Sequence, residues 1–479
     1  MNRETVTSML LKEFPHETTP GQQHLIEKLA GFLTGSWDNT RSLFILKGYA
    51  GTGKTTIVSA LVNVLPQLSK RSVLMAPTGR AAKVLTAYSQ KPANTIHRKI
   101  FFARTTKEGT IALKLQQNLH KYTLFIVDEA SMIQNSSLND LSQFSTRNIL
   151  DDLLTYVYGG ENNKLLFIGD SAQLPPVGHD NSPALDIEFM QKAYQLNIDS
   201  FELTEVVRQA QMSGILVNAT SIRKEINRQE VKFPVFSVKR FNDIERLNGS
   251  DLEEALNTAY SGTGKDNNAV ICRSNKRANI YNQEIRKRIL FFDNEINAGD
   301  YMMVVKNNYF WLPEGSSEGF IANGDIIELL RIRKIEELYG FRFADVTIRF
   351  LDYPDEKELD VKILLDTIMS ESAALVATDN NRLFQTVMED YSDIRSRRGR
   401  IEKVKSNPYF NALQVKFAYA LTCHKTQGGQ WNTIFIDQGW LNDKMINVEY
   451  LRWLYTAVTR ATKKVFLINF ESKFFFDED

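Results

Sequence analysis

Short, continuous runs of apolar residues recur through the first half of the chain, and each is followed by a stretch with helical spacing. The runs are Ser42–Lys47, Ser72–Ala76, Thr123–Val127 and Leu165–Gly169. They are too short and too uniformly apolar for surface helices, and they match the buried strands of a parallel sheet. Because helical stretches alternate with them, the sequence predicts an α/β unit built on a parallel sheet.

The same pattern returns in the second half, at Ala269–Cys272, Thr433–Asp437 and Val465–Asn469, and predicts a second α/β unit. Between residues 321 and 412 this unit is interrupted by a segment that is richer in charge and in strand-like alternation, as in Phe341–Phe350. We therefore expect a small β-rich insert here. Within the insert, Ile363–Leu383 has the pattern of a helix rather than of a strand.

A shorter interruption, His97–Lys121, separates two strands of the first unit. Its polar, glycine-containing middle lies between two extended arms, which predicts a β-hairpin. The predicted limits are 1–96 with 122–213 for the first unit, 97–121 for the hairpin, 214–320 with 413–479 for the second unit, and 321–412 for the insert.

Composition narrows the class of protein without naming a ligand. The 58 Lys and Arg residues nearly balance 57 Asp and Glu residues, so a nucleic-acid groove would have to be locally basic. Two distant cysteines, Cys272 and Cys423, predict no disulfide framework and indicate a reducing compartment. No zinc-like Cys/His spacing, apolar signal core or membrane-length apolar run is present in the sequence, so we expect an intracellular, cytoplasmic protein.

A phosphate-binding loop is predicted at Gly48–Thr55, which fits the pattern G-x-x-x-x-G-K-[ST] between a strand and a helical stretch. Glycines allow the backbone N–H groups to wrap the phosphates. Lys54 can reach the β- and γ-phosphates, and Thr55 can be a ligand of Mg²⁺. The candidate nucleotide-binding residues are Gly48, Gly51, Thr52, Gly53, Lys54, Thr55 and Thr56.

An acidic pair, Asp128 and Glu129, ends the third predicted strand of the first unit. The carboxyl ends of parallel strands face the ligand crevice. We therefore expect Asp128 to hold Mg²⁺ through water and Glu129 to activate the attacking water.

Several further segments resemble motifs of the superfamily-1 helicases, specifically the RecD-like, 5′-to-3′ group called 1B. They run in that family's order and span nearly the whole chain. In order, they are Thr19–Gln22 (Q motif), Ala76–Lys83 (Ia), Thr95–Arg98 (Ib), Asp128–Ser131 (Walker B), Gly169–Gly178 (III), Leu203–Gln209 (IV), Tyr419–Gly428 (V) and Tyr455–Ala461 (VI). The resemblance implies two RecA-like domains, with a small hairpin inserted in the first and an SH3-like, β-rich domain in the second.

The resemblance also assigns residues to the nucleotide. Gln22 would read the adenine edge of ATP through its amide, and Gln427 and Gly428 would belong to the nucleotide site.

Three more residues are implied for catalysis. Gln173 would sense the γ-phosphate, and Arg208 and Arg460 would stabilise charge on the γ-phosphoryl oxygens. Because Arg460 belongs to the second unit, the site would be complete only when the two units close.

Contacts to single-stranded DNA are implied for Pro77, Thr78, His97, Thr422 and His424. Thr and His side chains can bond phosphate oxygens without reading sequence, as a motor that slides along any strand requires.

Other candidates for nucleic-acid contact have an alternative interpretation. Tyr409, Phe410 and Trp431 are possible stacking platforms, although core packing is the expectation for such aromatics. The basic segment Arg395–Lys405 fits either a phosphate contact or a solvated face. Phe101 and Phe102 of the hairpin would either meet an exposed base pair or anchor the hairpin, and we expect at least one to be an anchor.

The sequence thus predicts an ATP-dependent, Mg²⁺-using DNA helicase that moves 5′-to-3′ on single-stranded DNA, with the direction resting on the resemblance alone. A single-strand translocase, an RNA helicase and a nucleotide-regulated DNA-binding protein without motor activity remain alternatives. A GTPase is not favoured, because the guanine motif Asn-Lys-x-Asp is absent; Asn275-Lys276-Arg277 is followed by Ala278.

Overall fold

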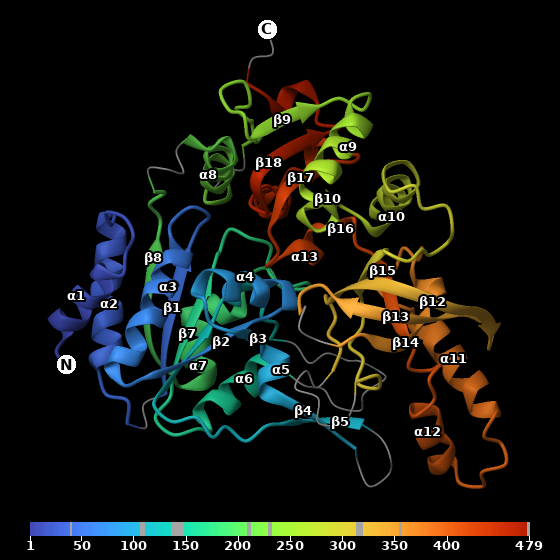
Figure 1. Ribbon diagram of the computed structural model, residues 1–479. Helices are drawn as coiled ribbons and strands as arrows, with labels where there is room; N and C mark the ends of the chain where they lie inside the picture. The colour runs from blue at the N-terminus through green and yellow to red at the C-terminus, as the bar shows by residue number, and fades with distance from the viewer. Residues whose placement is uncertain are drawn as a thin grey trace.

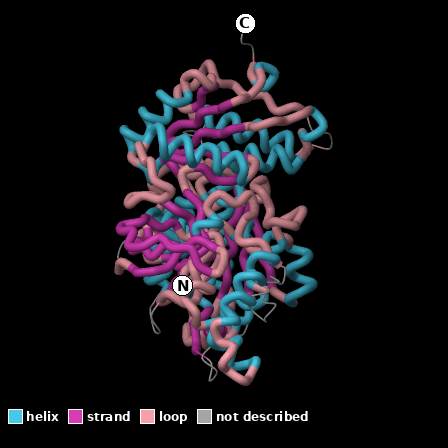
Figure 2. The backbone as a smooth tube through the Cα atoms, turned by 90° about the vertical axis from the view of Figure 1, so that its right-hand side faces the viewer, coloured by secondary structure: helices cyan, strands magenta, loops and turns pink. Residues whose placement is uncertain are grey.

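The structure is a computed structural model of the 479-residue chain, and it describes residues 1–38, 41–105, 111–135, 148–207, 212–228, 232–312, 320–353 and 357–476. Two sheets with their helices lie one above the other, and a β-barrel lies beside them (Figure 1). The view turned by 90° shows the second sheet and its helices as the upper part of the molecule (Figure 2).

Six parallel strands form the first sheet. In spatial order they are β3 (Ala93–Thr95), β2 (Arg71–Ala76), β6 (Thr123–Val127), β7 (Lys164–Gly169), β1 (Ser42–Gly48) and β8 (Asn197–Leu203). On β1, Leu43 and Ile45 enter one core layer, whereas Phe44 and Leu46 enter the other. Both faces of the strand are buried, which explains its continuous apolar run. The four strands predicted for the first unit are confirmed.

Helices cover both faces of this sheet. On one face lie α1 (Arg3–Lys12), α2 (Pro20–Thr34), α3 (Lys54–Val64) and α4 (Gly79–Ser89). On the other lie α5 (Ile96–Ile100), α6 (Ile149–Tyr158) and α7 (Ile187–Tyr194). The arrangement brings the loops at the carboxyl ends of the strands to one edge of the sheet, where ligands of such folds bind.

The second sheet is also parallel and has five strands. Their order is β16 (Ala420–Thr422), β10 (Asn268–Cys272), β17 (Trp431–Asp437), β18 (Ala461–Ile468) and β9 (Ile244–Leu247). Its helices are α8 (Gly214–Ile226) and α14 (Val448–Val458) in one core layer, α9 (Leu252–Thr263) and α10 (Asn275–Glu284) in the other, and the short α13 (Cys423–Thr426). The predicted second α/β unit is confirmed.

The predicted hairpin is an antiparallel pair of strands, β4 (Phe101–Thr105) and β5 (Ile111–Leu115), which forms a sheet of its own. Its turn, residues 106–110, lies outside the described residues. Phe101 is buried in the first domain's core, as expected for an anchor, whereas Phe102 is 38% exposed.

The insert contains a closed β-barrel, as the β-rich pattern predicts. Its strands are β11 (Tyr301–Val304), β12 (Ile326–Leu338), β13 (Phe341–Phe350), β14 (Leu359–Leu364) and β15 (Leu413–Phe417). Thus β11 and β15 come from just outside residues 321–412. Two helices, α11 (Ala377–Glu389) and α12 (Arg397–Lys405), extend from the barrel (Figure 1).

The helix expected at Ile363–Leu383 is wrong in its first part. Ile363 and Leu364 end strand β14, where they pair with Ala344 and Phe343, and the helix begins only at Ala377. A short apolar run fits a strand and a helix equally well, and here the pairing with β13 decides.

Candidate nucleotide site and interdomain groove

The loop between β1 and α3 has the geometry of a phosphate-binding loop. Gly51 and Gly53 have positive φ values of 74° and 87°, which favour glycine, and a Cβ at Gly53 would lie 2.5 Å from the Gln22 amide nitrogen. Lys54 opens α3, and its ammonium donates to the carbonyl oxygens of Gly48 at 2.6 Å and Tyr49 at 2.9 Å. The lysine therefore lies along the loop whose N–H groups would hold the phosphates.

Gln22 packs against this loop instead of standing free. Its amide oxygen accepts from the N–H of Thr19, and its amide nitrogen donates to the carbonyl of Thr52 at 3.0 Å. Thr52 is buried, with its hydroxyl turned to the Tyr49 carbonyl. The amide oxygen of Gln22 can accept a second hydrogen bond, and its amide nitrogen can donate a second one. Reading of adenine by this residue stays a prediction.

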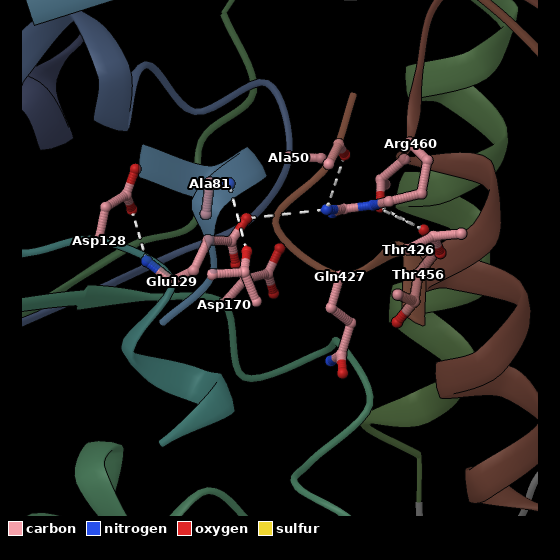
Figure 3. A network of polar contacts seen from close by, with 12 residues as sticks. Ala50, Ala81, Asp128, Glu129, Asp170, Thr426, Gln427, Thr456 and Arg460 are labelled. Carbon is pink, nitrogen blue, oxygen red and sulfur yellow. Dashed lines mark hydrogen bonds and ion pairs between the residues drawn. The ribbon is translucent and has the colours of Figure 1, made fainter. Parts of the chain in front are cut away.

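The acidic pair lies at the end of β6, as predicted. The Asp128 carboxylate accepts from the Glu129 N–H at 2.8 Å and from the Tyr88 hydroxyl on α4. Burial, followed by the charge of Glu129, raises the pKa of Asp128 to about 6. Glu129 has a left-handed backbone with φ of 52°, which directs it away from the strand. Figure 3 shows the two acids beside Asp170.

Asp170 is a site residue that the sequence interpretation missed. It follows β7, is 2% exposed, and accepts from the Ala172 N–H at 2.9 Å and the Tyr455 hydroxyl at 2.6 Å. Burial raises the pKa of Asp170, and the nearby charge of Lys54 opposes that shift. The rule that identified Asp128, an acid at the carboxyl end of a buried strand, would also have identified Asp170.

Arg460 reaches across from the second domain to the acidic pair. Its guanidinium lies 3.7 Å from the Glu129 carboxylate, and both side chains are largely buried (Figure 3). It also donates to the carbonyl oxygens of Thr456 at 3.1 Å and Gly429 at 3.3 Å. The structure thus brings the predicted cation of the second domain to the predicted catalytic acid of the first.

The segment Gln427–Gly428 lies at the contact between the two domains. The Gln427 amide donates to the Leu174 carbonyl at 2.6 Å, and a Cβ at Gly428 would lie 2.7 Å from that of Ala81. Glycine thus permits the close approach of the two backbones, and φ at Gly428 is 72°. Direct nucleotide binding by Gln427 and Gly428 stays a prediction.

Of the two remaining predicted catalytic residues, the structure describes Gln173 but not Arg208. Gln173 is buried, and its side-chain oxygen accepts no hydrogen bond from the described part of the chain. It lines a hollow of about 170 Å³ together with Ser131 and Asp170. Arg208 lies outside the described residues, directly after Val207, whose N–H donates to the Gly51 carbonyl at 3.0 Å.

The donors available to Mg²⁺ are hard oxygen atoms, which this ion prefers. Thr55 is exposed at the start of α3, and the buried Asp128 has a raised pKa, a shift that a neighbouring cation would reverse. Across the described ranges, no group of three or more His, Cys, Asp or Glu side chains could hold a metal ion. Mg²⁺ at nucleotide sites typically uses one or two carboxylates with substrate phosphates and water, so Thr55 and Asp128 fit it.

Four of the five predicted DNA-contact residues line one groove between the domains, which we call the interdomain groove. It has a volume of about 390 Å³. The first domain contributes Pro77, Thr78, Arg80 and His97, the second contributes His424, Lys425 and Trp431, and the barrel side contributes Met303, Asn323 and Gly324. Thr422 lines an adjoining hollow that also contains Lys425. The predicted contacts therefore form one continuous track.

Burial lowers the pKa values of the titratable side chains His97, His424 and Lys425 in the groove. It lowers the pKa of His97 to about 4 and that of Lys425 to about 8, and it also lowers the pKa of His424. Both histidines are neutral at pH 7, so they suit hydrogen bonding to phosphate rather than charge pairing. Lys425 donates to the Asn323 side chain at 2.8 Å, which ties the second domain to the barrel across the groove.

The aromatic candidates divide between the groove and the insert. Trp431 is 4% exposed but lines the groove, and the Arg80 guanidinium lies 4.1 Å from its ring centre. Tyr409 and Phe410 pack in the cluster that joins the barrel to α11 and α12. Core packing, the expected interpretation of these aromatics, is confirmed for Tyr409 and Phe410.

The barrel docks on the first domain through charged and aromatic contacts. The Arg98 guanidinium lies 3.6 Å from the Asp325 carboxylate and 3.8 Å from the Tyr353 ring centre. Lys83 donates to the Leu351 carbonyl at 2.9 Å. These contacts attach the barrel to the first domain.

Two family models match the chain, one at each domain. Residues 17–234 match an AAA domain, and residues 417–468 match a UvrD-like helicase C-terminal domain. No helix in the described ranges combines the length and the apolar character that crossing a membrane requires.

Relatives extend the likeness over most of the chain. The ATP-dependent DNA helicase dda of Enterobacteria phage T4 is 24% identical over 88% of this chain and 93% of its own length. The ATP-dependent RecD2 DNA helicase of Deinococcus radiodurans is 23% identical over 93% of this chain, which spans 48% of that relative. A crystal structure of Pif1 helicase from Bacteroides with ADP-AlF3 and single-stranded DNA matches with a TM-score of 0.45, 15% identity and 94% coverage of each chain.

The phosphate-binding loop, the acids at the strand ends and the paired parallel sheets define a P-loop NTPase with two RecA-like domains. Within that class, the chain is similar over most of its length to members of the RecD/Pif1-like, or 1B, branch of the superfamily-1 helicases.

Proposed function

We propose that this chain is an ATP-dependent DNA helicase that moves 5′-to-3′ on single-stranded DNA and acts in the cytoplasm. The observation that carries the proposal is the contact of Arg460 with Glu129 at 3.7 Å, because it completes one nucleotide site from two domains. The relatives named as DNA helicases support the substrate, and the branch to which they belong supports the direction. We also propose the predicted limits of the two domains, the hairpin and the insert as the functional division of the chain.

The residues around the site can divide the work of hydrolysis. Lys54 binds the β- and γ-phosphates, and Glu129 orients and deprotonates the attacking water. Thr55 and Asp128 would hold Mg²⁺, which neutralises phosphate charge when bound. Arg460 stabilises the charge that develops on the γ-phosphoryl oxygens.

The interdomain groove gives hydrolysis a mechanical outcome. The same two domains that share the nucleotide line the groove, with Thr78 and His97 on one side and His424 on the other. Opening and closing at the nucleotide therefore changes the spacing of the phosphate contacts along the strand. Alternate release of the two sets of contacts would move the protein along DNA.

Changing Arg460 to alanine is expected to slow ATP hydrolysis by about 10²-fold with little change in ATP affinity, because its charge acts mainly on the transition state. Steady-state kinetics and nucleotide-binding titration would measure both quantities. Arg452→Ala is the matched control, since Arg452, on α14, is a second arginine of this domain that bonds the first domain, at Asp180 and Asn181. Loss of ATP binding with an unchanged rate at saturation would contradict this role.

The proposed function is tested by ATPase assays with and without single-stranded DNA, followed by unwinding of duplexes with one tail. We expect DNA to stimulate ATPase activity and only duplexes with a 5′ tail to be unwound. An RNA strand of the same sequence is the second arm, since a preference for RNA would indicate recognition of the 2′-hydroxyl. Unwinding from a 3′ tail alone, or no effect of DNA on ATPase activity, would overturn the proposal.

A further inference from the structure

The hydroxyl of Tyr455 joins three parts of the nucleotide site. Tyr455 lies on α14 of the second domain, and its hydroxyl donates to the Asp170 carboxylate at 2.6 Å. The same hydroxyl accepts from the Ala50 N–H of the phosphate-binding loop at 2.9 Å. A residue of one domain therefore links the phosphate-binding loop to the acid at the end of β7 in the other.

The contact between Tyr455 and Asp170 is buried, and Tyr455 is always its donor. Tyr455 is 1% exposed, and burial raises the pKa of its hydroxyl, so the group stays protonated and donates to Asp170 at any working pH. Asp170 is buried as well, and its other described partner is the Ala172 N–H at 2.9 Å. A hydrogen bond to a buried carboxylate is stronger than one between neutral groups, so this link is a firm one.

The next residue of the helix strengthens the same junction. The Thr456 hydroxyl accepts from the Leu174 N–H at 2.9 Å, and the Gln427 amide donates to the Leu174 carbonyl. Both backbone polar groups of Leu174, in the loop after β7, are therefore bonded by the second domain. Figure 3 shows Gln427 and Thr456 on the second-domain side of the site and Asp170 on the first-domain side.

We propose that Tyr455 is a positioning residue for ATP hydrolysis, which holds Ala50 and Asp170 in the arrangement that the reaction needs only while the second domain is docked. The Lys54 ammonium is bonded to the carbonyl oxygens of Gly48 and Tyr49, in the same loop as Ala50, and its charge opposes the rise that burial causes in the pKa of Asp170. Undocking of α14 would release the phosphate-binding loop and Asp170 together, so the hydroxyl couples domain closure to the alignment of Lys54. This inference rests on the proposed function, because it assigns a role in the same ATPase reaction.

The ring and the hydroxyl of Tyr455 can be separated by experiment. The ring packs in a hydrophobic cluster that includes α14 and, from the first domain, Tyr49, Ala172 and Leu174, and phenylalanine would fill the same volume. We expect Tyr455→Phe to lower kcat of ATP hydrolysis by about 10-fold, as the loss of one hydrogen bond to a charged group predicts. We expect KM for ATP to stay within about twofold, because phosphate binding by Lys54 and the loop remains.

Tyr450→Phe is the matched control. Tyr450 is a buried tyrosine on the same helix, and its hydroxyl accepts from the Gln438 amide at 3.1 Å, a contact within the second domain. Its kcat and KM are expected to equal those of the wild type. An equal loss of kcat in both variants would overturn the proposal, because it would show a general effect of helix α14.

A double-mutant cycle tests whether Tyr455 acts through Asp170. Asp170→Ala is expected to lower kcat, and adding Tyr455→Phe to it is expected to lower kcat by less than about twofold more. Full additivity, or an unchanged kcat for Tyr455→Phe alone, would overturn the proposal. If Tyr455→Phe does not fold, Asp170→Ala still tests the same bond from its other end, and an unchanged kcat there would also overturn the proposal.

The experiments distinguish a failure of the proposed helicase function from a failure of the proposed role of Tyr455. If DNA does not stimulate the wild type, the helicase function fails, whereas the basal ATPase activity of the wild type and the variants still tests Tyr455. If DNA stimulates the wild type and Tyr455→Phe has the kcat of the wild type, the role of Tyr455 fails alone.

Discussion

Changing Glu129 to glutamine is expected to lower the rate of ATP hydrolysis by about 10³-fold while Mg·ATP still binds. Loss of a positioned catalytic base typically costs about 10²–10⁴ in rate. Glutamine keeps the size of the side chain and can still meet Arg460, which lies 3.7 Å from the carboxylate in the native site. The change therefore removes the base while leaving the junction between the domains filled. Single-turnover hydrolysis and nucleotide titration would separate the two effects.

The control for this prediction is Glu161→Gln. Glu161 pairs with Lys121 at the opposite edge of the same sheet, so the change removes a carboxylate without reaching the nucleotide. Turnover of Glu129→Gln at the wild-type rate would refute the assignment of Glu129 as the base.

Lys54→Ala is the complementary variant. It is expected to abolish ATPase activity, because no cation would face the β- and γ-phosphates.

The strands of the first sheet could be predicted because a strand that is buried on both faces is apolar along its whole length. In β6 every residue from Thr123 to Val127 is buried, which explains why this run is too short and too uniformly apolar for a surface helix. The acids that follow such a strand are placed by topology, which is why Asp128 and Glu129 could be identified without coordinates. In β14 the same reasoning failed, because pairing with β13 lies outside the information in Ile363–Leu383 itself.

Tyr455 shows why part of the site could not be predicted. It stands in the apolar pattern of α14, where a tyrosine ordinarily packs in a core, and its ring does so. Its partner Asp170 is 285 positions away in the sequence, and Ala50 contributes only a backbone N–H. No local pattern predicts such a contact, because it depends on how the two sheets dock on each other.

Gln22 illustrates the opposite case, in which a motif locates a residue without fixing its bonds. The motif assigned Gln22 to the adenine of ATP, and in the structure its amide nitrogen lies 3.0 Å from the Thr52 carbonyl oxygen of the phosphate-binding loop. Its other amide group closes a capping box with Thr19 at the start of α2. A glutamine three residues after a threonine is typical of a helix capping box as well as of the Q motif. The motif therefore locates Gln22 but does not decide between a bond to the helix start and a bond to the nucleotide.

Replacing Arg104–Leu113 with a short Gly/Ser turn is expected to abolish duplex unwinding and leave DNA-stimulated ATPase activity within about threefold of the wild type. The hairpin forms a two-stranded sheet of its own, separate from the six-stranded sheet that bears the nucleotide site. The cut spares the base of the hairpin, where Phe101 is buried and pairs with Leu115. His97, at the interdomain groove, precedes the cut and is also retained.

The reason for the expected split is that walking on one strand and parting two strands make different demands. ATP hydrolysis and translocation use the nucleotide site and the groove, whereas separation needs a rigid surface against which the duplex divides. Phe102, which is 38% exposed beside the buried Phe101, offers an apolar face to a base pair. Phe102→Ala is therefore expected to weaken unwinding more than ATPase activity. Leu119→Ala, in the same segment but beyond the hairpin and 77% exposed, is the matched control and should change neither activity. Equal loss of both activities in a folded hairpin variant, or full retention of unwinding, would refute the role of the hairpin in strand separation.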